Sequence, residues 1–153
     1  QPAVGYNWGA QKFSRVRAIE KCCFTASGVV SLLSVFVIAL FPEQITSLFV
    51  ADAGSEILSI SVTALRLFSL TYITRWFSFA GQSFMLAIEK PLPASVISVS
   101  TALIFPLVLI GALWPLGLTG IWLNFPGTSV LAAVLALIIL KKLSREWKRQ
   151  DAE

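Results

Sequence analysis

The sequence lacks histidine, has only two cysteines and carries few charges. Lys, Arg, Asp and Glu make up 13% of its 153 residues, whereas a soluble domain has about 25% because its surface must face water. Without histidine or an acidic cluster, the usual ligands of zinc and haem are missing. Cys22 and Cys23 are adjacent in a stretch expected in the cytoplasm, so no disulfide framework is expected. The sequence therefore predicts no metal site and no resident cofactor.

Hydrophobic residues make up 56% of the chain, and residues 91–140 contain no Asp, Glu, Lys or Arg. An uncharged stretch of that length is enough for two membrane crossings of about 20 residues each. Disordered and nucleic-acid-binding proteins need low hydrophobicity or dense basic clusters, so no nucleic-acid partner is expected. The sequence predicts an all-α, polytopic membrane protein whose surroundings are the lipid bilayer.

Charges, prolines and turn residues divide the chain into four predicted transmembrane helices preceded by the tail of another helix. In the helix 12–41 the uncharged part, 22–41, is long enough to cross about 30 Å of hydrocarbon. Pro91 and Pro93 end the second helix. The predicted segments are 1–11 (helix tail and loop), 12–41 (transmembrane), 42–55 (external connection), 56–89 (long transmembrane), 93–113 and 119–140 (transmembrane) and 141–153 (basic tail).

Lys and Arg gather on one side of this predicted topology. They occur before the first span, after the second at Lys90 and after the fourth, and they are absent from the other two connections. Positive residues favour the cytoplasmic side of a membrane, so both ends of the chain are predicted to be cytoplasmic. An even number of crossings also requires the two ends to share a side, and the two arguments agree.

One cation is predicted to lie deep in the membrane. Arg75 lies about 20 Å inside the hydrocarbon if that region ends near Ile88, and a charge there is costly unless it faces a cavity or a partner. Polar and aromatic side chains share its helical face, namely Phe68, Thr71, Tyr72, Ser78, Phe79 and Gln82. Two interpretations stay open. The stripe lines a cavity for bulky, partly polar organic molecules, or Arg75 pairs with another helix and locks the bundle.

All 8 acidic residues are predicted at helix ends or in connections. An ion relay needs an ionisable acid within the membrane, so no coupling site is predicted in this chain. No nucleophile–base pair is evident either, and the chain is not predicted to be an enzyme. Hydroxyl side chains at Ser27, Ser31 and Ser34 recur at helical spacing on the first span, which favours close packing of helices.

Short motifs in order along the chain resemble the multidrug and toxic compound extrusion (MATE) family. Gln1, Pro2, Tyr6, Asn7 and Gly9 are similar to the end of that family's eighth helix. Segments 40–52, 84–91 and 120–126 resemble the stretch that follows its ninth helix, the end of its tenth and the start of its twelfth. The resemblance implies the C-terminal part of such a transporter, from the end of helix 8 to helix 12, within a six-helix bundle. Its partners are then the N-terminal helices of the same transporter.

Membership would imply a cation-coupled antiporter that exports drugs, dyes and other small organic substrates by alternating access, expected in a bacterial cytoplasmic (inner) membrane. The coupling ion, H⁺ or Na⁺, is expected to bind outside this chain, because the helix that resembles the tenth carries Arg66 and Arg75 and no acid. Two alternatives stay open. One is a flippase for lipid-linked precursors in the same superfamily, whose cavity is basic because its cargo carries phosphates. The other is a membrane scaffold subunit that transports nothing.

Overall fold

The structure, a computed structural model, describes residues 1–50 and 55–150. Within these ranges the regular elements are all helices, which confirms the predicted all-α membrane fold. They are α1 (Pro2–Gly9), α2 (Phe13–Leu40), α3 (Pro42–Ser47), α4 (Ser55–Ser69), α5 (Tyr72–Ala87), α6 (Pro91–Val99), the π-helix η1 (Ser100–Ile104), α7 (Phe105–Leu113), the 3-10 helix η2 (Trp114–Leu116) and α8 (Gly117–Gln150). Parts of the predicted connection 42–55 and tail 141–153, namely 51–54 and 151–153, lie outside the described residues.

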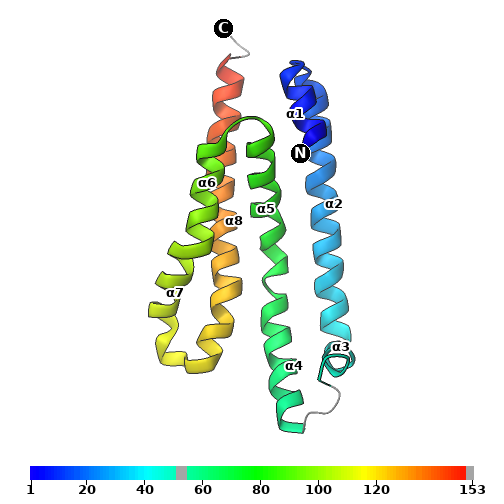
Figure 1. Ribbon diagram of the computed structural model, residues 1–153, viewed down its shortest axis with the longest axis vertical. Coiled ribbons are helices and arrows are strands. Elements are labelled where there is room, and N and C mark those ends of the chain that lie inside the picture. The colour runs from blue at the N-terminus through cyan, green and yellow to red at the C-terminus, as the bar shows by residue number, and fades with distance from the viewer. Residues whose placement is uncertain (51–54, 151–153) are drawn as a thin grey trace.

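The long helices run side by side in the bundle (Figure 1). α5 packs against α2 on one side and against α6 and α8 on the other, while α7 packs against α8. Both ends of the described chain and the turn between α5 and α6 lie at one end of the bundle, at the top of Figure 1. The basic residues at the start of α2, after α5 and after residue 140 therefore gather at that end, which is called the basic end below.

Length and composition permit two to three membrane crossings among the described residues. α2 and the stretch Pro91–Arg145 each qualify, and α4 with α5 qualifies if this bent pair is one span. Pro91–Arg145 reverses direction at η2, where Gly117 has a φ of +57° that side chains other than glycine rarely tolerate. α7 and the first part of α8 consequently lie antiparallel (Figure 1). The predicted total of four crossings stays a prediction.

The helix predicted over residues 56–89 is not continuous. α4 and α5 meet at an angle of 45°. At the break the Thr71 N–H donates to the Phe68 carbonyl, three residues back, at 3.0 Å. Two hydroxyls bond to carbonyls here, Ser69 Oγ to that of Arg66 at 2.7 Å and Ser129 Oγ to that of Thr71 at 2.8 Å. Side chains that enter the backbone ladder in this way bend helices. The prediction missed the bend because no proline or glycine marks it.

Other boundaries also differ from the predicted ones. α6 begins at Pro91 rather than at 93, because proline fits the first turn of a helix, where its missing N–H is not needed. The π-helix η1 directly precedes α7, whose second residue is Pro106, and such turns change the hydrogen-bond register of a helix. α8 continues without interruption through the described part of the basic tail.

Two small clusters of buried side chains hold the helices together. One lies at the basic end and consists of Val4, Val16, Phe84, Ile88 and Leu143. The other joins α5, α6 and α8 through Met85, Ala94, Ile97 and Ala136. Most other large apolar side chains of the long helices are exposed, as expected where the surroundings are lipid rather than water.

Candidate functional site

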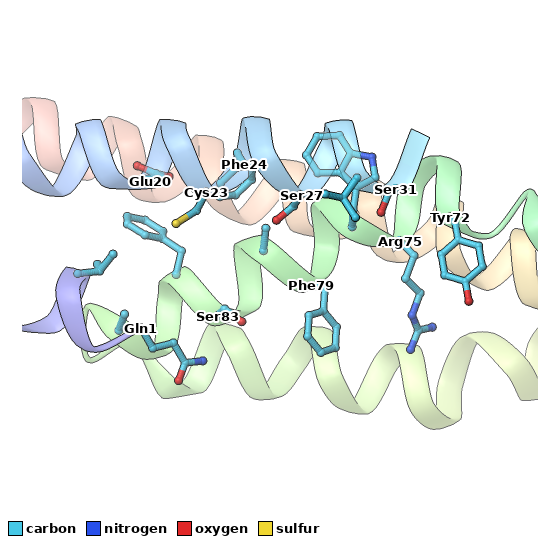
Figure 2. Close-up of a pocket in the computed structure, with 16 residues that line it drawn as sticks. Gln1, Glu20, Cys23, Phe24, Ser27, Ser31, Tyr72, Arg75, Phe79 and Ser83 are labelled. Carbon is cyan, nitrogen blue, oxygen red and sulfur yellow. The ribbon is translucent and has the colours of Figure 1, made fainter. Parts of the chain in front are cut away.

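A cavity of about 430 Å³ lies between α1, α2 and α5 (Figure 2). Glu20 and Gln1 lie at one end of it, and Tyr72 and Arg75 lie at the other. α2 supplies Cys23, Phe24, Ser27 and Ser31 to its wall, and α5 supplies Trp76, Phe79, Ser83 and Phe84. The lining therefore combines aromatic rings with hydroxyls, one cation and one acid.

An aromatic seam holds the two walls of this cavity together. Phe24 on α2 meets Phe77 edge to face at 5.5 Å and Trp76 at 6.4 Å between ring centroids. Gly28 is buried against the Trp76 ring, where an added Cβ would lie 3.3 Å from the nearest ring atom. The Trp76 indole N–H donates to the Ile73 carbonyl at 2.9 Å, which fixes the ring. The seam thus sets the spacing between α2 and α5.

A smaller groove of about 160 Å³ lies between α5 and the α6–η1 segment. Arg75 and Phe79 line both this groove and the larger cavity, so the two hollows meet along one ridge of α5. In Figure 2 both of these side chains point away from α2. Phe79 is 63% exposed and Tyr72 is 45% exposed. We call the surface formed by Tyr72, Arg75 and Phe79 the α5 ridge.

The structure places five of the seven predicted stripe residues along these hollows. Tyr72, Arg75 and Phe79 line the cavity, and Ser78 and Gln82 line the groove. The Gln82 side chain also ties α5 to α6, because its Nε2 donates to the Ala94 carbonyl at 3.1 Å. Ser78 Oγ donates to the Arg75 carbonyl at 3.0 Å and serves the backbone of its own helix.

The other two predicted residues, Phe68 and Thr71, lie elsewhere. The Phe68 ring packs on Phe125 with 4.3 Å between centroids. Thr71 is buried at the α4–α5 break, and its Oγ1 has no hydrogen-bond partner. The helical wheel treats residues on both sides of residue 71 as one straight helix. The bend there changes the directions in which side chains of α4 point relative to those of α5.

Residues of the family-like motif lie on or beside α1. Gln1 lines the cavity, and Pro2 occupies the first turn of α1. Asn7 Nδ2 donates to the Ala3 carbonyl at 2.8 Å, so this amide supports its own helix. Tyr6 is exposed, and a Cβ added at Gly9 would meet nothing within 4 Å. Of the five motif residues, Gln1 alone is among the residues that line the cavity of Figure 2.

Sequence reasoning missed the wall that α2 contributes. Cys23, Ser27 and Ser31 line the cavity at intervals of four residues, whereas the serine spacing predicted a contact between helices. The spacing shows that the three share a face, but it does not show what that face meets. Glu20 was also missed, because it precedes the uncharged part of α2.

Electrostatically, the cavity has a cation at one end and an acid at the other. Arg75 is exposed and forms no ion pair with any residue that the structure describes. An arginine cannot lose its charge at neutral pH. The α5 ridge therefore offers a permanent positive charge between two aromatic rings.

Comparison with known proteins identifies a family. The MatE family profile matches residues 1–110 of the chain. The matched region contains α1 to α6 and η1, and so both walls of the cavity. No curated protein and no solved structure matches the chain.

Proposed function

The chain belongs to the MatE family of membrane transporters, and from this premise we propose that it works in the cation-coupled efflux of small organic molecules. In this proposal it forms the C-terminal part of an antiporter, from the end of the eighth helix to the twelfth. One helical bundle rocks against the other, so that a central cavity opens alternately to each side of the membrane. Both ends of the chain lie in the cytoplasm, and the membrane is a bacterial cytoplasmic membrane.

The observation that carries the proposal is the α5 ridge. Aromatic rings supply contact area for bulky organic molecules, and a polar or charged group fixes their orientation. Arg75 forms no ion pair with a described residue, which supports the cavity interpretation over a lock between these helices. Because the one fixed charge on the ridge is positive, the proposed substrates are organic anions or zwitterions. Positively charged drugs would fit only if an acid from the rest of the transporter neutralised Arg75.

Coupling to H⁺ or Na⁺ is assigned to the rest of the transporter. From residue 57 to residue 88, a stretch that includes all of α5, the sequence has no carboxylate. The acid that does line the cavity, Glu20, lies at the end opposite the α5 ridge. We therefore propose that the coupling ion binds on helices that precede this chain, and those helices are its proposed protein partners.

The test is dye export by cells that express the intact transporter. Arg75→Ala is expected to lower the export of anionic and zwitterionic dyes, and Arg75→Lys is expected to retain part of it because the charge remains. Arg66→Ala is the matched control, since Arg66 is an exposed arginine on α4 that lines neither hollow. Unchanged export of every dye by Arg75→Ala would remove the proposed role of the ridge. Selective loss of cationic dyes would instead indicate an Arg75 that is neutralised by a carboxylate.

A second candidate function is a flippase for lipid-linked precursors. The permanent charge of Arg75 favours it, because phosphate-bearing cargo needs cations in the cavity. Further cavity cations in the helices before this chain, together with complementation of a flippase-deficient strain, would favour the flippase. A scaffold subunit without transport activity predicts that neither assay responds to Arg75→Ala.

A further inference from the structure

A separate crevice of about 320 Å³ lies at the basic end, between α2, α5 and α8. Its lining is mixed in chemistry. Positive charge comes from Arg17 and Lys141, a hydroxyl comes from Ser144, and an apolar floor comes from Phe84, Leu143 and Trp147. Phe84 and Glu20 also line the substrate cavity, whereas the other residues of the crevice do not. The crevice is therefore a second hollow with its own charge.

Aromatic packing fixes the floor of the crevice. The Trp147 ring stacks on Trp8 of α1 with 4.9 Å between centroids and an angle of 23° between the planes. It also meets the Phe84 ring edge to face at 6.1 Å. Phe84 and Leu143 belong to the buried cluster at this end of the bundle. These contacts join α1, α5 and α8, so the crevice is preformed and does not depend on a ligand for its shape.

The crevice is positive even though it contains one acid. Glu20 lines it together with Arg17 and Lys141, so ionised Glu20 still leaves one positive charge in excess. Lys21, Lys142 and Arg145 lie on the same ends of α2 and α8 and add to the positive field. Such a field attracts anions.

The position of the crevice selects among possible anions. It lies at the end of the bundle where Lys and Arg gather, and such ends lie at the level of lipid headgroups. Leu140 lines the crevice one turn from Ser144, on the side toward the uncharged part of α8, so the lining becomes apolar in the direction of the bilayer. A phosphate joined to acyl chains matches this change from charged to apolar lining. We propose that the crevice binds the headgroup of an anionic phospholipid, with the phosphate between Arg17 and Lys141.

The test is retention of lipid by the detergent-purified protein, followed by native mass spectrometry. Phosphatidylglycerol is expected to stay bound where phosphatidylcholine is lost. Lys141→Gln is expected to weaken phosphatidylglycerol binding about fivefold, as removal of one lysine near a charged headgroup does. Lys141→Arg is expected to retain it. Lys142→Gln is the matched control, because it removes the same charge from the next residue of α8, which does not line the crevice.

Three outcomes would overturn the proposal. Equal retention of the two lipids would show that the headgroup charge is not recognised. Equal losses from Lys141→Gln and Lys142→Gln would assign the attraction to general surface charge. Displacement of phosphatidylglycerol by millimolar inorganic phosphate would assign the crevice to a soluble anion. Lys141 is exposed, so the variants are expected to fold, and thermal unfolding in detergent verifies this.

Discussion

Ser129 is predicted to be the main support of the bend between α4 and α5. Its side chain is fully buried, and its Oγ donates to the Thr71 carbonyl at 2.8 Å. Thr74 Oγ1 lies 2.9 Å from the Ser129 Oγ. A serine hydroxyl has one proton, and because Thr71 receives it, Thr74 must be the donor in the second bond. Ser129→Ala removes both interactions, whereas Thr74→Val removes one with little change of shape.

The magnitude follows from these two bonds. Hydrogen bonds between helices in membrane proteins contribute about 0.6 kcal/mol on average and at most about 1.7 kcal/mol. Ser129→Ala is therefore expected to lower the free energy of unfolding by about 1–2 kcal/mol, and Thr74→Val by about 0.6 kcal/mol. Because Ser129→Ala already removes the acceptor of Thr74, the double variant is expected to lose no more than Ser129→Ala alone. The coupling energy between the two sites is then about 0.6 kcal/mol.

The assay is reversible unfolding of the purified protein in mixed micelles, applied to the wild type, both single variants and the double variant. Ser95→Ala is the control, since this exposed serine on α6 is expected to change stability by less than about 0.5 kcal/mol. Strictly additive losses from Ser129→Ala and Thr74→Val would refute the assignment of donor and acceptor. A Ser129→Ala variant as stable as the Ser95→Ala control would refute the role of Ser129 in the bend.

Two further predictions concern the turn at η2 and the acid in the cavity. In a helix alanine is favoured over glycine by roughly 1 kcal/mol. Gly120→Ala is nevertheless expected to destabilise the protein, by more than that amount, because its Cβ would clash with the Leu113 carbonyl oxygen. Gly111→Ala, whose Cβ meets nothing within 4 Å, is expected to be neutral or stabilising; equal thermal shifts for the two variants would contradict this. Glu20→Gln is expected to stabilise the protein at neutral pH, because partial burial disfavours a charged carboxylate. A variant that is no more stable than the wild type would contradict this expectation.

The distribution of charge predicted the helical membrane fold, and short motifs that resemble the MATE family predicted the family. Both inferences depend on patterns that lie along the chain, such as the uncharged stretch 91–140 and the motif that begins at Gln1. The all-α membrane fold is confirmed, and membership of the family is confirmed by the match over residues 1–110. The position of the chain within a transporter, helix 8 to helix 12, stays a prediction.

The bend at Thr71 could not be predicted from its own neighbourhood. The hydroxyl that bonds to the Thr71 carbonyl belongs to Ser129, on another helix. For the same reason the helical wheel placed Phe68 with Arg75, although Phe68 packs against Phe125. A wheel describes one straight helix, and contacts between distant segments decide whether that helix stays straight.

The α2 wall of the cavity was hidden for a different reason. Cys23 and Ser27 share a face of α2, and the sequence contains this spacing. Whether a small polar face packs against a neighbour or lines a hollow depends on the distance between the helices. Trp76 and Phe24 set that distance, because their rings hold α2 and α5 apart at the seam.

If the hollow between α2 and α5 receives the substrate, a bound substrate must shield the side chains that line it, and the two cysteines of this chain allow this to be measured. Both are exposed, but Cys23 lines the cavity and Cys22 does not. Cys22→Ser and Cys23→Ser each leave one thiol in this chain, and in an intact transporter whose cysteines outside this chain are replaced, the rate at which a membrane-impermeant reagent labels it can be measured. A transported dye is expected to slow the labelling of Cys23 and to leave that of Cys22 unchanged. Equal slowing at both cysteines, or at neither, would contradict it.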